Sequence, residues 1–214
     1  MFDYNYSIHK LNYFLRRYSL FLLLILLSLI VGIITGSIAV KVLSYQQKEE
    51  LVNYLGNFSG EIEKLIVKRD TLFTELMMSN LKFIFVLWLL GLSLVGVIFI
   101  PVIIFFRGFI LGFTVGFLVD EMFFKGLILA LIAIFPQNLF VLPALLLGAL
   151  FCLVFAFKLI VRILGSHNLP HDFPVVVINY SLLMSLSALL LVAAAAIETY
   201  LTPILIRIFS NFLG

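Results

Sequence analysis

The residues most suited to chemistry stand near residue 170, where two histidines and an aspartate come close together. His167 and His171 are four residues apart and Asp172 follows directly, a spacing that would place metal ligands on one face of a helix. Pro170 lies between the two histidines, so helical spacing cannot be assumed. A solvated loop is therefore the favoured interpretation of this stretch.

The sequence lacks the motifs that mark common enzyme families. It contains no Walker A lysine loop, GxSxG elbow, HExxH zinc motif or Cys/His metal spacing. Its one cysteine, Cys152, lies in an apolar run and cannot build a disulfide or a CxxC pair. We expect no catalytic residue, no metal site and no cofactor, so the chain is not predicted to be an enzyme.

A cluster of charges follows a glycine-rich stretch and has two interpretations. Asp120, Glu121 and Lys125 could form a site for ions or protons inside the membrane, because charges at depth are usually functional. In the alternative, which we favour, these residues lie at the membrane interface where a spanning helix ends.

Three polar or helix-breaking residues interrupt an uncharged run that extends from residue 126 to residue 157. Pro136 cannot donate a backbone hydrogen bond, and lipid cannot satisfy the side chains of Gln137 and Asn138. These residues could coordinate a substrate in a broken-helix site of the transporter kind, or they could cap helix ends within a structural break. The structural break is the favoured interpretation.

The elements that must hold these residues are membrane helices. The chain has 214 residues, is 64% hydrophobic and 12% charged, and has a mean hydropathy of +1.22, whereas soluble domains are about 25% charged. A spanning helix needs roughly 20 apolar residues, and four uncharged stretches meet or approach that length: 19–40, 83–106, 126–157 and 173–197. We predict an all-α integral membrane protein with about five transmembrane helices, a broken or re-entrant helical element and one small helical hairpin outside the bilayer. The net charge of +3 is spread over loops, which argues against nucleic-acid binding.

The predicted organisation has five parts along the chain. They are an amphipathic tail (1–18), a first transmembrane helix (19–43), a polar helical hairpin (44–80), a multi-span core (81–198) and a C-terminal amphipathic segment (199–214). The hairpin is too small to bury a core of its own, so it should pack on itself, on lipid or on a partner. The N-terminus is expected inside because dense cations precede the first helix, although the positive-inside count alone does not decide.

Small residues recur at every fourth position in two helices and predict close packing of helices. We expect these two ladders to pack against each other. Arg107, before the first ladder, is expected to anchor in lipid headgroups, and Pro143 lies near the start of the second helix, where a missing donor costs least. A helix from residue 108 to 135 would be about 42 Å long, so a bend is expected near its charge cluster. The ladders are Gly108, Gly112 and Gly116, and Ala144, Gly148, Cys152 and Ala156.

The stretch from residue 105 to residue 157 resembles the stage II sporulation protein M family. The resemblance rests on FFRGFILGFTVGFLVDEMFFKGLILALIAIFPQNLFVLPALLLGALFCLVFAF, in particular on its glycine ladder, on Pro136-Gln137-Asn138 and on Leu142-Pro143-Ala144. Chain length, the N-terminal tail, the single hairpin and the last span also fit. Many relatives outside spore formers carry Pro-His-Gly and a glutamate before Leu-Pro-Ala, so functions tied to those residues are not carried over.

That resemblance implies a multi-pass protein of the bacterial cell membrane, in the septal or engulfing membrane of the sporangium. In this role it would be a non-catalytic scaffold for two peptidoglycan-degrading partners, stage II sporulation proteins D and P, with the lipid bilayer as its surroundings. The alternative is a small transporter or permease-like subunit. Homo-oligomers are left open.

Overall fold

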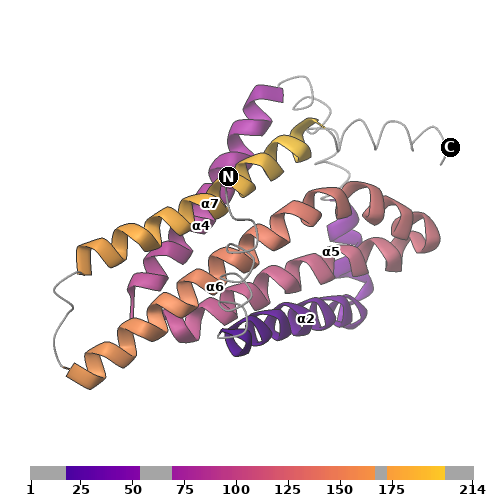
Figure 1. Ribbon diagram of the computed structural model, residues 1–214. Helices are drawn as coiled ribbons and strands as arrows, with labels where there is room; N and C mark the ends of the chain where they lie inside the picture. The colour runs from indigo at the N-terminus through magenta and orange to yellow at the C-terminus, as the bar shows by residue number, and fades with distance from the viewer. Residues whose placement is uncertain (1–17, 54–68, 167–172, 201–214) are drawn as a thin grey trace.

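The computed structural model describes residues 18–53, 69–166 and 173–200, and all regular structure in these ranges is helical. The helices are α2 (Ser19–Val42), α4 (Arg69–Leu92), α5 (Gly96–Ala133), α6 (Phe135–Ser166) and α7 (Phe173–Tyr200) (Figure 1). Residues 45–53 form a further helical segment after α2. Within the described residues, five helices are long and apolar enough to cross a membrane, which confirms the predicted all-α, multi-span fold.

Successive spans run in alternating directions, which makes α2 and α5 parallel. Gly32 lies against the backbone of Phe105 and Phe109, and Gly36 lies against Phe109 and Phe113, so both helices advance together by four residues. In contrast, α6 and α7 are antiparallel, since Cys152 contacts Tyr180 and Gly148 contacts Ser187.

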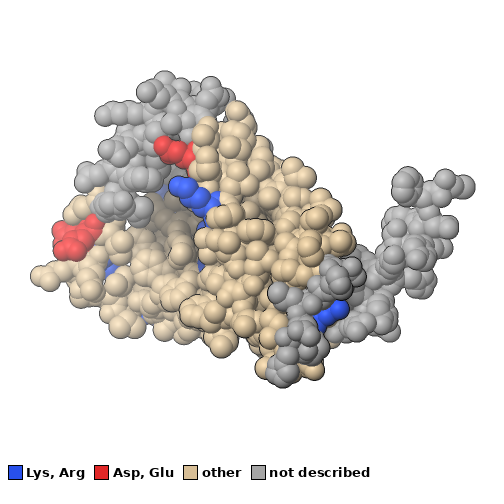
Figure 2. Space-filling model, turned by 90° about the vertical axis from the view of Figure 1, so that its left-hand side faces the viewer, with Lys and Arg blue, Asp and Glu red and all other residues tan. Residues whose placement is uncertain are grey.

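The helix at the centre of the bundle is α6, which touches α2, α4, α5 and α7. Its residues Ala144, Ala149 and Ala156 are fully buried, because small side chains let the neighbouring helices approach. The outside of the bundle carries large apolar side chains from every span, for example Leu20 on α2 and Leu189 on α7. Figure 2 views the bundle from the end where α6 ends and α7 begins, and most of the described side chains in this view are uncharged as well. A surface of this kind suits lipid rather than water.

Two breaks shape the second half of the bundle. Phe123 has φ 50° and ψ −125° inside α5, and residues after it turn back beside the helix, so that Gly126 packs on the backbone of Leu118. The expected bend therefore lies between Glu121 and Lys125. The second break, at Ile134, separates α5 from α6 directly before Pro136, and the uncharged run is indeed two elements.

The predicted second span, residues 83–106, is wrong. The chain turns at residues 93–95, where Ser93 N–H donates to Leu90 O and Gly96 N–H donates to Ser93 O. This turn has no charged residue, so the hydropathy of the sequence does not indicate a boundary between two helices here. The span on its N-terminal side is Phe73–Leu92, which places Lys82 inside a membrane helix instead of before it.

The predicted hairpin of residues 44–80 is altered in the same way. Residues 54–68 lie outside the described residues, together with nearly all of the N-terminal tail and of the C-terminal segment. Residues 69–80 belong to α4 and continue into its span without interruption. The polar residues Asn80 and Lys82 predict a boundary at this point of the sequence, but α4 continues through them.

Candidate functional site

Among the described helices, the most extensive contact is a seam of glycines between α2 and α5. A Cβ atom at Gly32 or Gly36 would overlap the carbonyl oxygens of Phe105 and Phe109, and a Cβ atom at Gly108 or Gly112 would overlap those of Leu29 and Ile33. The two backbones are thus in direct contact. Ser37 crosses the seam as well, donating from Oγ to the carbonyl oxygen of Gly112 at 3.0 Å. We call Gly32, Gly36, Gly108, Gly112 and Gly116 the glycine seam.

The prediction that the two small-residue ladders pack against each other is wrong. The nearest atoms to Gly108, Gly112 and Gly116 all belong to α2. The ladder on α6 faces α4 and α7 instead, where a Cβ atom at Gly148 would lie 2.9 Å from Ile84 Cδ1 and 3.5 Å from Ser187 Cβ. The reason is that α2 supplies its own GxxxG pair, a spacing that was readable in the first apolar run and was missed.

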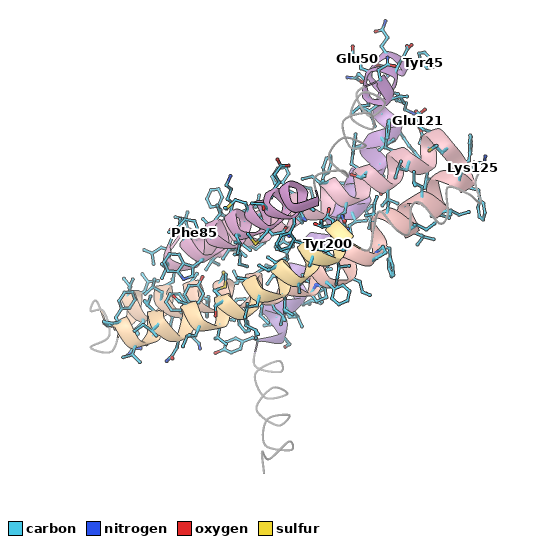
Figure 3. The ribbon with its side chains drawn as sticks, turned by 90° about the horizontal axis from the view of Figure 1, so that it is seen from above. Tyr45, Glu50, Phe85, Glu121, Lys125 and Tyr200 are labelled. Carbon is cyan, nitrogen blue, oxygen red and sulfur yellow. The ribbon has the colours of Figure 1, made fainter. Side chains whose placement is uncertain are left out.

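One end of the bundle is polar and is built from two segments far apart in the sequence. Lys48 and Asp120 form an ion pair there, with side chains that are both partly buried. Glu121 and Lys125 are exposed beside the bend in α5. Figure 3 shows Tyr45, Glu50, Glu121 and Lys125 at the same end of the molecule. We call residues 45–50 and 120–125 the polar end.

The break before α6 is stabilised locally by Asn138. Its Nδ2 donates to the carbonyl oxygen of Ile134 at 2.8 Å, as a side chain that caps a helix break would do. Its Oδ1 is buried without a hydrogen-bond partner and lies beside a cavity of about 310 Å³ between α2, α5 and α6. Pro136 and Gln137 are half-buried, and Pro143 is exposed within α6, not in its first turns, because the helix begins at Phe135.

Arg107 does not lie at a helix end, so the expected headgroup anchor does not describe it. It adjoins Gly108, which contacts Leu29 near the middle of α2. Its guanidinium carbon is 5.8 Å from the centre of the Phe83 ring, a cation–π distance, and its charge interacts with that of Glu198 on α7. The sequence interpretation placed it at an edge because it took residues 83–106 as one span.

A buried polar cluster between α4, α6 and α7 gave no recognisable pattern in the sequence. Tyr180 Oη donates to the carbonyl oxygen of Trp88 at 3.1 Å and lies 3.1 Å from Cys152 Sγ. Trp88 Nε1 donates to Ser181 Oγ at 3.0 Å. These contacts satisfy polar groups within the bundle, so the cluster fixes helix positions.

Among the described residues there is no group of three or more His, Cys, Asp or Glu side chains that could hold a metal ion. His167, His171 and Asp172 lie outside these residues, so the structure does not test the loop interpretation. The charges of Asp120, Glu121 and Lys125 gather at the polar end and share no cavity with Asn138.

Comparison with known families gives one result. The model of the family described as stage II sporulation protein M matches residues 23–203, a range that includes the glycine seam, the polar end and the break at Pro136. No curated protein and no solved structure shows significant similarity to the chain. The match spans most of the sequence and all five apolar helices, so this multi-pass membrane protein belongs to the stage II sporulation protein M family.

Proposed function

We propose that the protein is a non-catalytic scaffold that recruits peptidoglycan-degrading partners to the septal membrane during engulfment. The observation that carries the proposal is the rigid attachment of the polar end to the membrane bundle. Family membership supports a role in sporulation, and the partners implied by the sequence resemblance are stage II sporulation proteins D and P.

Rigidity comes from two connections that act on the same pair of helices. The glycine seam holds the backbones of α2 and α5 in contact, and the Lys48–Asp120 ion pair joins the segments that follow them. Backbone contact leaves little room for sliding or rotation. A partner that binds the polar end is therefore held at a fixed position relative to the membrane.

The test is co-purification from detergent-solubilised membranes of sporulating cells with tagged full-length protein. Replacing the exposed residues Tyr45, Glu49 and Glu50 by serine or glutamine should reduce the recovery of proteins D and P at least several-fold. The matched control replaces Lys158 and Arg162, exposed cations at the opposite end, by glutamine and should leave recovery unchanged. Equal recovery from all variants would contradict a role for the polar end.

The scaffold role also requires the polar end to face the cell wall. Gln46 is exposed in the helical segment after α2, so Gln46→Cys should react with a membrane-impermeant maleimide in intact cells. Reaction only after the cells are opened would place the polar end in the cytoplasm and overturn the proposal.

A small transporter remains the second candidate because the unpartnered Oδ1 of Asn138 lies beside a membrane-embedded cavity. In that case Asn138→Ala would abolish substrate or ion flux in proteoliposomes while partner recovery stayed normal. If the protein is a scaffold, wild-type proteoliposomes show no substrate or ion flux, and Asn138→Ala leaves partner recovery normal.

A further inference from the structure

The outward face of α4 changes character halfway along the helix. Towards its C-terminal end the exposed side chains are apolar, with Phe85 56% and Leu89 47% exposed, and Figure 3 shows Phe85 projecting from this helix. One and two turns earlier the same face carries Lys82 and Ser79, and Glu75 continues it towards the N-terminal end of α4. We call Glu75, Ser79 and Lys82 the polar stripe of α4.

The polar stripe reaches the middle of the bundle. Ile84 contacts Gly148 near the middle of α6, and Gly148 in turn contacts Ser187 near the middle of α7. Lys82 precedes Ile84 by two residues, an axial rise of only about 3 Å. The edge of a hydrocarbon core about 30 Å thick is roughly 15 Å from its centre, so Lys82 lies much nearer to the centre than to either surface.

Nothing in the described part of the chain compensates this charge. The inward side of α4 contacts the other helices of the bundle. Asn80 Nδ2 donates to the carbonyl oxygen of Leu191 at 3.4 Å, and the Phe83 ring lies under the guanidinium group of Arg107. Lys82 points the other way and makes no ion pair with any residue that the structure describes. A charged group at this depth is costly when it faces lipid, and such groups usually pair with another group.

We propose that the polar stripe of α4 binds a transmembrane helix of another protein, with a carboxylate of that helix opposite Lys82. This inference rests on the proposed scaffold function and specifies where a membrane-anchored partner docks. Charge complementarity selects the carboxylate. A second copy of this chain is disfavoured, because a two-fold axis normal to the membrane would bring like charges together at equal depth.

The test uses designed peptides and does not depend on the identity of the partner. Three Leu/Ala transmembrane peptides with lysine ends carry Glu, Gln or Leu at the central position. Association with the full-length protein is measured by energy transfer in phosphatidylcholine vesicles at neutral pH. The Glu peptide should bind the wild-type protein on the order of tenfold more tightly than the Leu peptide, as expected for a charge-assisted contact between helices.

Two variants and one control establish whether Lys82 is responsible. Lys82→Met, which makes α4 more apolar and should insert normally, is expected to bind all three peptides equally. Lys41→Met, at the exposed end of α2, should keep the preference for the Glu peptide. Equal binding of the Glu and Leu peptides to the wild-type protein would overturn the inference, as would an unchanged preference in Lys82→Met. Wild-type self-association that Lys82→Met abolishes would assign the stripe to a second copy instead.

The outcome separates this inference from the function on which it rests. If Lys82→Met recovers proteins D and P from sporulating membranes as well as the wild type does, recruitment stands and docking through α4 is refuted. If neither the wild-type protein nor the Lys82→Met variant recovers proteins D and P while the wild type prefers the Glu peptide, the helix-binding stripe stands and the proposed partners are wrong.

Discussion

Replacing Gly112 by alanine should lower the free energy of unfolding. The loss should be larger than for the same replacement at Gly116, or at Gly148 or Gly165 of α6. A Cβ atom at Gly112 would lie 2.7 Å from both the carbonyl carbon and the Cα of Ile33 and would overlap its carbonyl oxygen. Ordinary contact begins near 3.4 Å, so α2 must move outward by about 0.7 Å or more. The blocking atoms are backbone, and no side-chain rotation can relieve the overlap.

The expected cost follows from that displacement. A gap of roughly 0.5–1 Å removes a quarter to a half of the dispersion attraction between atoms that were in contact, and overpacking typically costs about 1–3 kcal/mol. We expect the upper part of this range, since the Ser37–Gly112 hydrogen bond is stretched as well. The free energy of unfolding can be measured in mixed micelles through the fluorescence of Trp88, the single tryptophan.

Two other glycines provide graded controls for the same methyl group. At Gly148 the Cβ atom would meet the flexible end of Ile84 at 2.9 Å, and at Gly165 it would meet nothing within 4 Å. Gly148→Ala should therefore cost less than Gly112→Ala. Gly165→Ala should change the unfolding free energy by no more than about 1 kcal/mol, in the stabilising direction, because alanine favours helix. Equal stability of the three variants would refute backbone contact between α2 and α5.

The seam also predicts coupling between its two sides. Gly36→Ala forces the same outward movement of α2, because its Cβ atom would overlap the carbonyl oxygen of Phe109. Once α2 has moved for one methyl group, the second meets less resistance, so the double variant with Gly112→Ala should cost less than the two single variants together. Strict additivity would mean that each overlap is relieved locally.

Three further outcomes are expected. Lys48→Glu should lower the unfolding free energy by at most about 1 kcal/mol, as partly exposed pairs do, and adding Asp120→Lys should restore it; failure of the swap would show that the pair is not specific. Cys152 is fully buried, so the folded protein should resist maleimide labelling until it is unfolded, and rapid labelling in mild detergent would contradict the packing of α6. Asn138→Leu should change the unfolding free energy by no more than about 1 kcal/mol, because it removes a buried oxygen without a partner while losing one hydrogen bond; loss of folding would show that this oxygen has a partner.

Hydropathy and helix-breaking residues were enough to predict the fold class and two of its breaks. The run of apolar residues predicted spanning helices, and the bend in α5 follows from a helix too long to stay straight through Asp120 and Lys125. The break before α6 follows from Pro136. These features depend on local properties of the chain, namely a missing donor, a charge or an excess of length, and such properties are readable in one sequence.

Partner choice between helices was not readable in the same way. Every glycine ladder offers a close approach, but the sequence does not say which helix accepts it. The pairing of Gly112 with α2 depends on Gly32 and Gly36 lying at matching depth, and depth depends on where each span begins. Because the turn at residues 93–95 is uncharged, the sequence does not show where α5 begins. Arg107 is therefore predicted at an edge of the membrane.

Three of the charged residues within the spans, Arg107, Glu198 and Lys82, bear on the choice between the proposed scaffold and a transporter. Arg107 lies against the Phe83 ring and interacts with Glu198, while Lys82 faces away from the bundle. A conducting path would need its charged groups to line a shared water-filled cavity. The cavity beside Asn138 is lined by none of these three residues. Arg107 lies against α4 and is influenced by the charge of Glu198 on α7, and Lys82 is exposed on the outside of the bundle; this arrangement fits the proposed scaffold better than a conducting path.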